Sequence, residues 1–94
     1  MRFNDLRLHD ALIGAIHISW ESERCDIRFN LVGGGCQWLV FEGFTKLDFP
    51  RAEPWGASQS VNTVQEKAPG VFEIELQSGD VLHIVAPHWS YRSE

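Results

Sequence analysis

The stretch that decides the fold is VFEIELQSGDVLHIV, residues 71–85. Apolar and polar residues alternate on both sides of Gln77-Ser78-Gly79, which is typical of two strands that each bury one face. A two-residue loop would place glutamates opposite apolar residues. A three-residue loop with Gly79 in the left-handed conformation, followed by a bulge, brings apolar residues together instead, and the pattern predicts this second register. Its expected pairs are Phe72 with Ile84, Glu73 with His83, and Ile74 with Leu82.

Two more hairpins are predicted nearer the N-terminus. Alternating apolar residues flank a four-residue loop at 21–24, and they also flank the triple glycine at 33–35. Loops at these two places put the apolar side chains of three successive strands on one face, as a half-buried sheet requires. The expected pairs are Trp20 with Cys25, Ile18 with Ile27, and Ile16 with Phe29 in the first hairpin, and Leu39 with Phe29 and Phe41 with Ile27 in the second.

These hairpins indicate the fold class. Residues 4–13 fit neither the helical nor the strand period, so we expect an irregular segment or a short edge strand there. Residues 87–94 are expected to pack through Trp89 and then to fray. A chain of 94 residues with 44% hydrophobic content can bury a single core. We predict one all-β domain over residues 1–94, an antiparallel barrel-like sheet or a compact β-sandwich of about six or seven strands, with little or no helix.

The charge balance restricts the partners. Lysine and arginine total 8 against 13 aspartates and glutamates, a formal net charge of -5 at pH 7. Nucleic-acid binding needs a basic surface, so we expect no nucleic-acid partner, whereas a basic protein partner is compatible with the acidic balance. No apolar run approaches the roughly 20 residues of a membrane span, and the N-terminus lacks the apolar core of a secretory signal. We therefore expect a cytoplasmic protein with no membrane partner.

The cysteines and histidines predict neither a metal nor a cofactor. Cys25 and Cys36 lie many positions apart along the predicted ladder, too far for a disulfide. These two cysteines and four scattered histidines lack the spacing of a zinc site. We expect two reduced thiols, with no metal and no cofactor. No catalytic residue is assigned, because the chain has neither a nucleophile-elbow pattern nor a phosphate-binding glycine loop before a helix.

The candidate site lies in the longest stretch between predicted strands, residues 50–62. Ordinary connections run about 4–6 residues, and longer ordered ones are often functional. Trp55 is either a hydrophobic plug over an open end of the sheet or a rigid anchor for a ligand or partner, and its exposure separates the two interpretations. The candidate binding residues, including a His9-Asp10 pair expected to lie nearby, are His9, Asp10, Trp55, Ser58, Ser60 and Asn62.

Several short motifs along the chain carry a family resemblance. They are LHD at 8–10, CDIRF at 25–29, FEG at 41–43, PWGASQSVN at 54–62 and QSGD at 77–80. Together they resemble families of small, uncharacterised, mostly bacterial β-rich proteins, which carry no agreed activity. Some similar small acidic proteins neutralise toxins as immunity proteins. No immunity residue matches this chain position by position, so the resemblance implies no site residue.

Two functional hypotheses remain. The first is a non-catalytic binding or protein-interaction domain that uses the 54–62 stretch. The alternative is a small hydrolase or ligand-converting enzyme that uses His9, Asp10 and a loop serine, for which His9 and a loop hydroxyl must lie within hydrogen-bonding reach. Unpaired edge strands also predict possible homo-oligomers, since they present ready-made pairing surfaces.

Overall fold

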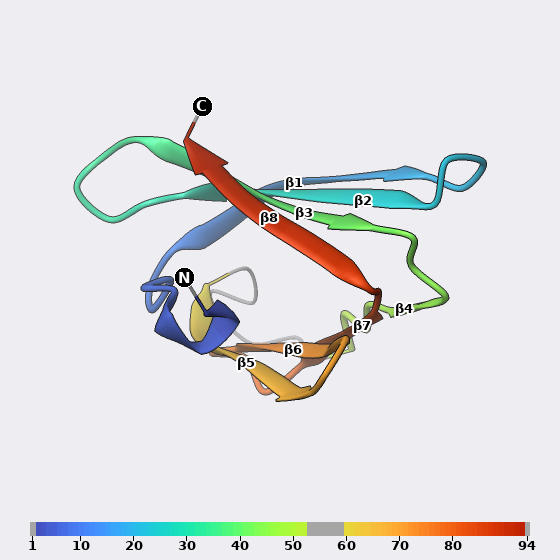
Figure 1. Cartoon of the computed structure of the whole chain (residues 1–94). Coiled ribbons are helices and arrows are strands. Elements are labelled where there is room, and N and C mark those ends of the chain that lie inside the picture. Colours follow the sequence, from blue (N-terminus) through green and yellow to red (C-terminus); the bar gives the residue numbers. More distant parts are fainter. Residues whose placement is uncertain (1, 53–59, 94) are drawn as a thin grey trace.

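The chain forms a β-sandwich of two four-stranded antiparallel sheets. The computed structural model describes residues 2–52 and 60–93. One sheet has the strand order β1-β2-β3-β8 and the other β4-β7-β6-β5, and the two face each other (Figure 1). The elements are the 3₁₀ turn η1 (Phe3–Asp5) and the strands β1 (Leu12–Ser19), β2 (Arg24–Asn30), β3 (Cys36–Glu42), β4 (Lys46–Asp48), β5 (Val61–Ala68), β6 (Val71–Leu76), β7 (Val81–Val85) and β8 (His88–Ser93). The all-β prediction is confirmed in its sandwich form, and the sheets do not close into a barrel.

The described residues contain eight strands, where six or seven were expected. The additional strand is β8, which pairs with β3 from Glu42↔His88 to Gln37↔Ser93. Trp89 packs against the core as expected. The expected fraying after it is wrong, because pairing with β3 satisfies the backbone of the segment as far as Ser93.

The β6–β7 hairpin has the register that its alternation predicts. Phe72 lies opposite Ile84, and Ile74 lies opposite Leu82. Gly79 has φ 102°, the left-handed conformation that the three-residue loop requires and that glycine adopts without a steric penalty. The apolar residues of both strands therefore share one buried face.

The two upstream hairpins pair two positions away from the expected registers. Ile18 lies opposite Cys25, and Leu39 lies opposite Ile27. In the first hairpin Trp20 belongs to the turn, where its carbonyl accepts a 3.3 Å hydrogen bond from the N–H of Glu23. In the second hairpin the loop is longer than the three glycines, since the N–H of Leu31 donates to Gly35 O at 3.0 Å. A shift of two residues keeps the same side chains on the same face, so β2 and β3 bury the predicted side chains, whereas Ile16 and Ile18 of β1 are only partly covered.

The core lies between the sheets and extends to the N-terminal segment. The ring centroid of Phe3 lies 4.7 Å from that of Phe72, 5.2 Å from that of Trp89 and 6.1 Å from that of Phe41. Residues 3–8 thus close the side of the sandwich between β8 and β5. The fully buried residues of the core include Phe3, Leu8, Cys25, Ile27, Phe29, Leu39, Phe41, Val61, Phe72, Ile74 and Ile84.

Candidate functional site

The His9-Asp10 pair lies beside the start of β5, as expected. The N–H of Asp10 donates to Val61 O at 2.8 Å, and the N–H of Val61 donates to Ala11 O at 2.8 Å. The His9 ring donates from Nδ1 to the carbonyl of Asn62 at 2.8 Å. Asp10 has φ 68°, a left-handed conformation that aspartate tolerates better than most residues. These bonds bind residues 9–11 to residues 61–62.

Gln77 completes this cluster, and sequence reasoning missed it. Its side-chain amide donates to Asp10 Oδ1 and, at 3.2 Å, to Val61 O. Its backbone N–H donates to Ser60 O at 2.8 Å. Gln77 begins the β6–β7 loop, and no spacing in the sequence links that loop to residues 9–10. We call Asp10, Val61 and Gln77, with the backbone that they bind, the N-terminal joint.

The chemistry of the joint is structural hydrogen bonding. A carbonyl oxygen can only accept, so the proton of the His9–Asn62 bond resides on Nδ1. The other ring nitrogen, Nε2, lies 3.5 Å from Asp10 Oδ1, and this contact is an ion pair only when His9 is protonated. The Asn62 side chain donates to Glu75 Oε1 at 2.7 Å. Ser60 is buried, and among the described residues no serine hydroxyl is hydrogen-bonded to His9.

The structure describes four of the six predicted site residues. His9, Asp10, Ser60 and Asn62 lie together at the joint. Trp55 and Ser58 lie outside the described residues. A groove of about 350 Å³ with a mixed polar and apolar lining borders the joint between the N-terminal segment and β5, and it includes Arg7, His9 and Asn62. These contacts provide backbone anchoring, and no general base is aimed at a nucleophile among them.

Within residues 2–52 and 60–93, no group of three or more histidine, cysteine or acidic side chains could hold a metal ion. Both cysteines are free. Burial raises the pKa of Cys25 to about 12, so this thiol stays protonated and unreactive at neutral pH. The sulfur of Cys36 accepts a 3.0 Å hydrogen bond from Arg28 and donates to Asn30 Oδ1 at 3.3 Å. No helix in the described part of the chain has the length and apolar character to cross a membrane.

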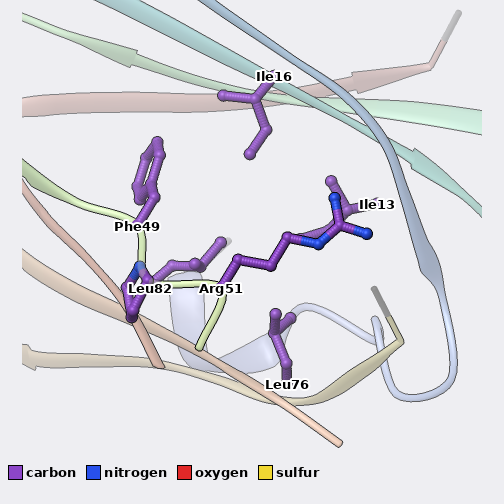
Figure 2. A pocket seen from close by; sticks show the side chains of 7 residues that line it. Ile13, Ile16, Phe49, Arg51, Leu76 and Leu82 are labelled. Atoms are coloured by element: carbon purple, nitrogen blue, oxygen red, sulfur yellow. The ribbon is translucent and has the colours of Figure 1, made fainter. Parts of the chain in front are cut away.

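A second candidate region lies between β1 and the segment that follows β4. It is an open cavity of about 230 Å³. Figure 2 shows the side chain of Arg51 reaching across it toward Ile13, with Phe49 and Ile16 above and Leu76 below. The lining residues are Ile13, Ile16, Phe49, Pro50, Arg51, Leu76 and Leu82.

The edge strand β1 borders this cavity and carries most of the exposed apolar surface. Of the five exposed large apolar side chains in the described residues, Leu12, Ile16, Ile18 and Trp20 belong to β1 or to the turn after it. Ile18 is 48% exposed and Trp20 is 79% exposed. The β1–β2 hairpin projects past the second sheet (Figure 1), and near its tip the ring of Trp20 lies 5.7 Å from the ring of Phe44.

The comparisons with known proteins support the fold. No family model matches the chain, and no curated protein matches it either. The crystal structure of an uncharacterised protein from Neisseria gonorrhoeae is similar, with a TM-score of 0.65 over 89% of this chain and 91% of that one. The two sequences are 12% identical, so the likeness extends to the arrangement of the strands and no further. This chain is thus a β-rich protein with an uncharacterised structural neighbour.

Proposed function

We propose that this protein is a non-catalytic protein-interaction domain that binds an extended strand of its partner along β1. The observation that carries the proposal is the concentration of exposed apolar side chains on one edge strand. An edge strand offers unpaired N–H and C=O groups to a further strand, and alternate side chains supply the specificity.

The four edge strands differ in their protection. Natural sheets discourage unwanted pairing with charged side chains or with very short edge strands. Lys46 and Asp48 occupy the three-residue β4, Glu66 and Lys67 lie in β5, and Arg92 lies in β8. Strand β1 reads LIGAIHIS and has no aspartate, glutamate, lysine or arginine. Its one protective device is a bulge between Ile13 and Ala15, which leaves residues 15–19 regular and open.

The chemistry of the partner follows from the charge near β1. The turn that ends the hairpin contains Glu21 and Glu23, both exposed, and the whole chain carries a net charge of -5. An extended segment with alternating apolar residues and flanking lysines or arginines would place apolar side chains beside Ile16 and Ile18 and cations near the acidic turn. An immunity-like role, in which the acidic chain covers a basic toxin surface in a bacterial cytoplasm, would use the same edge.

Amide hydrogen exchange with a defined peptide tests this proposal. Binding of the peptide KVTVTVK should slow exchange of the residue 15–19 amides that point away from β2 by at least about tenfold, because new strand pairing protects them. The peptide EVTVTVE has the same strand propensity and the opposite flanking charge, and it should protect them much less. No protection of these amides at millimolar KVTVTVK would refute strand addition at β1.

Two matched variants test the place of binding. Ile18→Lys puts a charge into the apolar face of the new strand pair and should abolish protection by the peptide. Val32→Lys is the control, since Val32 is 74% exposed on the other hairpin loop, and it should leave protection unchanged. Equal loss in both variants would mean that general surface hydrophobicity, and not β1, holds the peptide.

A second copy of this chain could pair with β1 in place of a separate partner. The sequence Ala15-Ile16-His17-Ile18-Ser19 is symmetric in polarity about His17, so an antiparallel pair of two copies would place Ile16 beside Ile18 of the partner subunit. Light scattering on the chain alone measures this. If the chain forms a stable dimer and Ile18→Lys converts it to a monomer, then the strand that pairs with β1 comes from a second copy of this chain and not from a separate partner protein.

A further inference from the structure

The cavity beside β1 combines an apolar lining with a single cation. Ile13, Ile16, Phe49, Leu76 and Leu82 supply its apolar walls, and Arg51 is the one charged residue in the lining. Pockets for small molecules have this composition, with many apolar contacts and few polar groups that fix the orientation. The combination points to an amphipathic ligand.

The charge around Arg51 favours an anion. Among the described residues Arg51 forms no ion pair with a carboxylate, and its side chain lies across the cavity (Figure 2). The carboxylate of Asp80 lies near the same segment, where one oxygen accepts a 3.4 Å bond from the N–H of Ala52 and the other a 3.4 Å bond from the Ser78 hydroxyl. A guanidinium that pairs with no carboxylate within residues 2–52 and 60–93, and that lies at the edge of an apolar cavity, is suited to bind a carboxylate through charge-assisted hydrogen bonds.

The volume limits the size of the ligand. A water-sized group occupies about 30 Å³ in a liquid, so a cavity of about 230 Å³ holds seven or eight such groups. We propose that this cavity binds a small aliphatic carboxylate of about five or six carbon atoms, whose two carboxylate oxygens bring the total to seven or eight groups, with its tail among Ile13, Ile16 and Leu82 and its carboxylate on Arg51. Strand addition at β1 also uses Ile16, but the ligand additionally needs the interior of the cavity and the Arg51 cation, so the two proposals can fail separately.

Methyl NMR with hexanoate tests the site. Hexanoate should shift the methyl signals of Ile13, Ile16, Leu76 and Leu82 in a saturable manner, with half-saturation on the order of 1 mM for a ligand of this size. Hexan-1-ol and hexylammonium share the tail and lack the negative charge, and each should bind at least about tenfold more weakly. Absence of saturable shifts, or equal binding of hexylammonium, would overturn the proposal.

A length series tests the size limit. Affinity should rise from butanoate to hexanoate, because each buried methylene adds to the apolar contact. It should change by less than about twofold from hexanoate to dodecanoate, since the additional methylenes would remain in water. A continued steep rise to dodecanoate would show a surface-active effect in place of a bounded cavity.

Variants of Arg51 test the cation. Arg51→Gln should weaken hexanoate binding about tenfold, the usual cost of a charge-assisted hydrogen bond, and should leave hexan-1-ol binding within about twofold. Arg51→Lys should retain most of the affinity. The control is Arg92→Gln, which removes an exposed cation from β8 and should have no effect. These variants leave β1 intact, so peptide protection of residues 15–19 should persist even where hexanoate binding is lost.

Discussion

The two long sides of the sandwich differ in how far the gap between the sheets is filled. Between β8 and β5 the N-terminal segment fills the gap, and Phe3 there is 0% exposed. Between β1 and β4 the apolar cavity remains open, and Ile16 is 36% exposed. The difference shows that a gap between the two sheets is filled only where another segment of the chain packs into it. A gap that stays open leaves apolar surface that a ligand or partner can cover.

The largest expected effect is the removal of the closing side chain. Phe3→Ala should lower the free energy of unfolding by about 3–5 kcal/mol, because a fully buried aromatic leaves a cavity among Phe41, Phe72 and Trp89. Ile16→Ala on the open side should cost only about 1–2 kcal/mol, since part of that side chain already contacts water. Urea unfolding measures both. Equal costs would mean that the two sides are equally closed.

An intermediate effect concerns how far water reaches past β1. Cys25 lies on β2 opposite Ile18 and is 0% exposed. Burial raises its pKa to about 12, above the usual thiol value of about 8.5 in an unfolded chain. The folded state therefore keeps the proton longer. The thiol's contribution to stability is fully present below about pH 8.5, and it is lost as the pH rises toward 12, by at most about 1.4 kcal/mol per pH unit.

Urea unfolding of the wild type and of Cys25→Ala between pH 8 and pH 11 measures this contribution. The difference in unfolding free energy between the two proteins should shrink as the pH rises, because Cys25→Ala has no thiol to titrate. A constant difference across this range would mean that water enters beneath β1 and reaches β2.

The smallest expected effect is at the N-terminal joint, where the chain passes from the closed side into β1. Gln77→Ala should cost about 1–2 kcal/mol, because it removes two hydrogen bonds to Asp10 and Val61. The amide of Asp10 should then exchange faster. Gln65→Ala, at an exposed position of β5, is the control and should stay within about 0.5 kcal/mol of the wild type. If both variants lower the free energy of unfolding by the same amount, the hydrogen bonds of the N-terminal joint do not hold the N-terminal segment in place.

The candidate site was predictable only in part. His9 and Asp10 were placed near the 54–62 stretch without a pattern that required it, and they lie beside Ser60 and Asn62. Gln77 was missed, because a glutamine in a hairpin loop has no local signal for a contact 67 positions away. The cavity was missed as well, since it combines β1, β6, β7 and the segment after β4. Whether Trp55 serves as a plug or an anchor lies outside the described residues.

Local patterning alone determined the all-β class, the buried faces of β2, β6 and β7, and the β6–β7 register. Strand alternation has a period of two, and Gly79 allows one loop geometry that keeps both apolar faces together. Tertiary packing decided that Trp20 belongs to a turn, that residues 88–93 form β8, and that Phe3 closes one side while the β1 side stays open. These outcomes depend on which distant segment supplies hydrogen bonds and apolar contacts, and no short stretch of the chain encodes that choice.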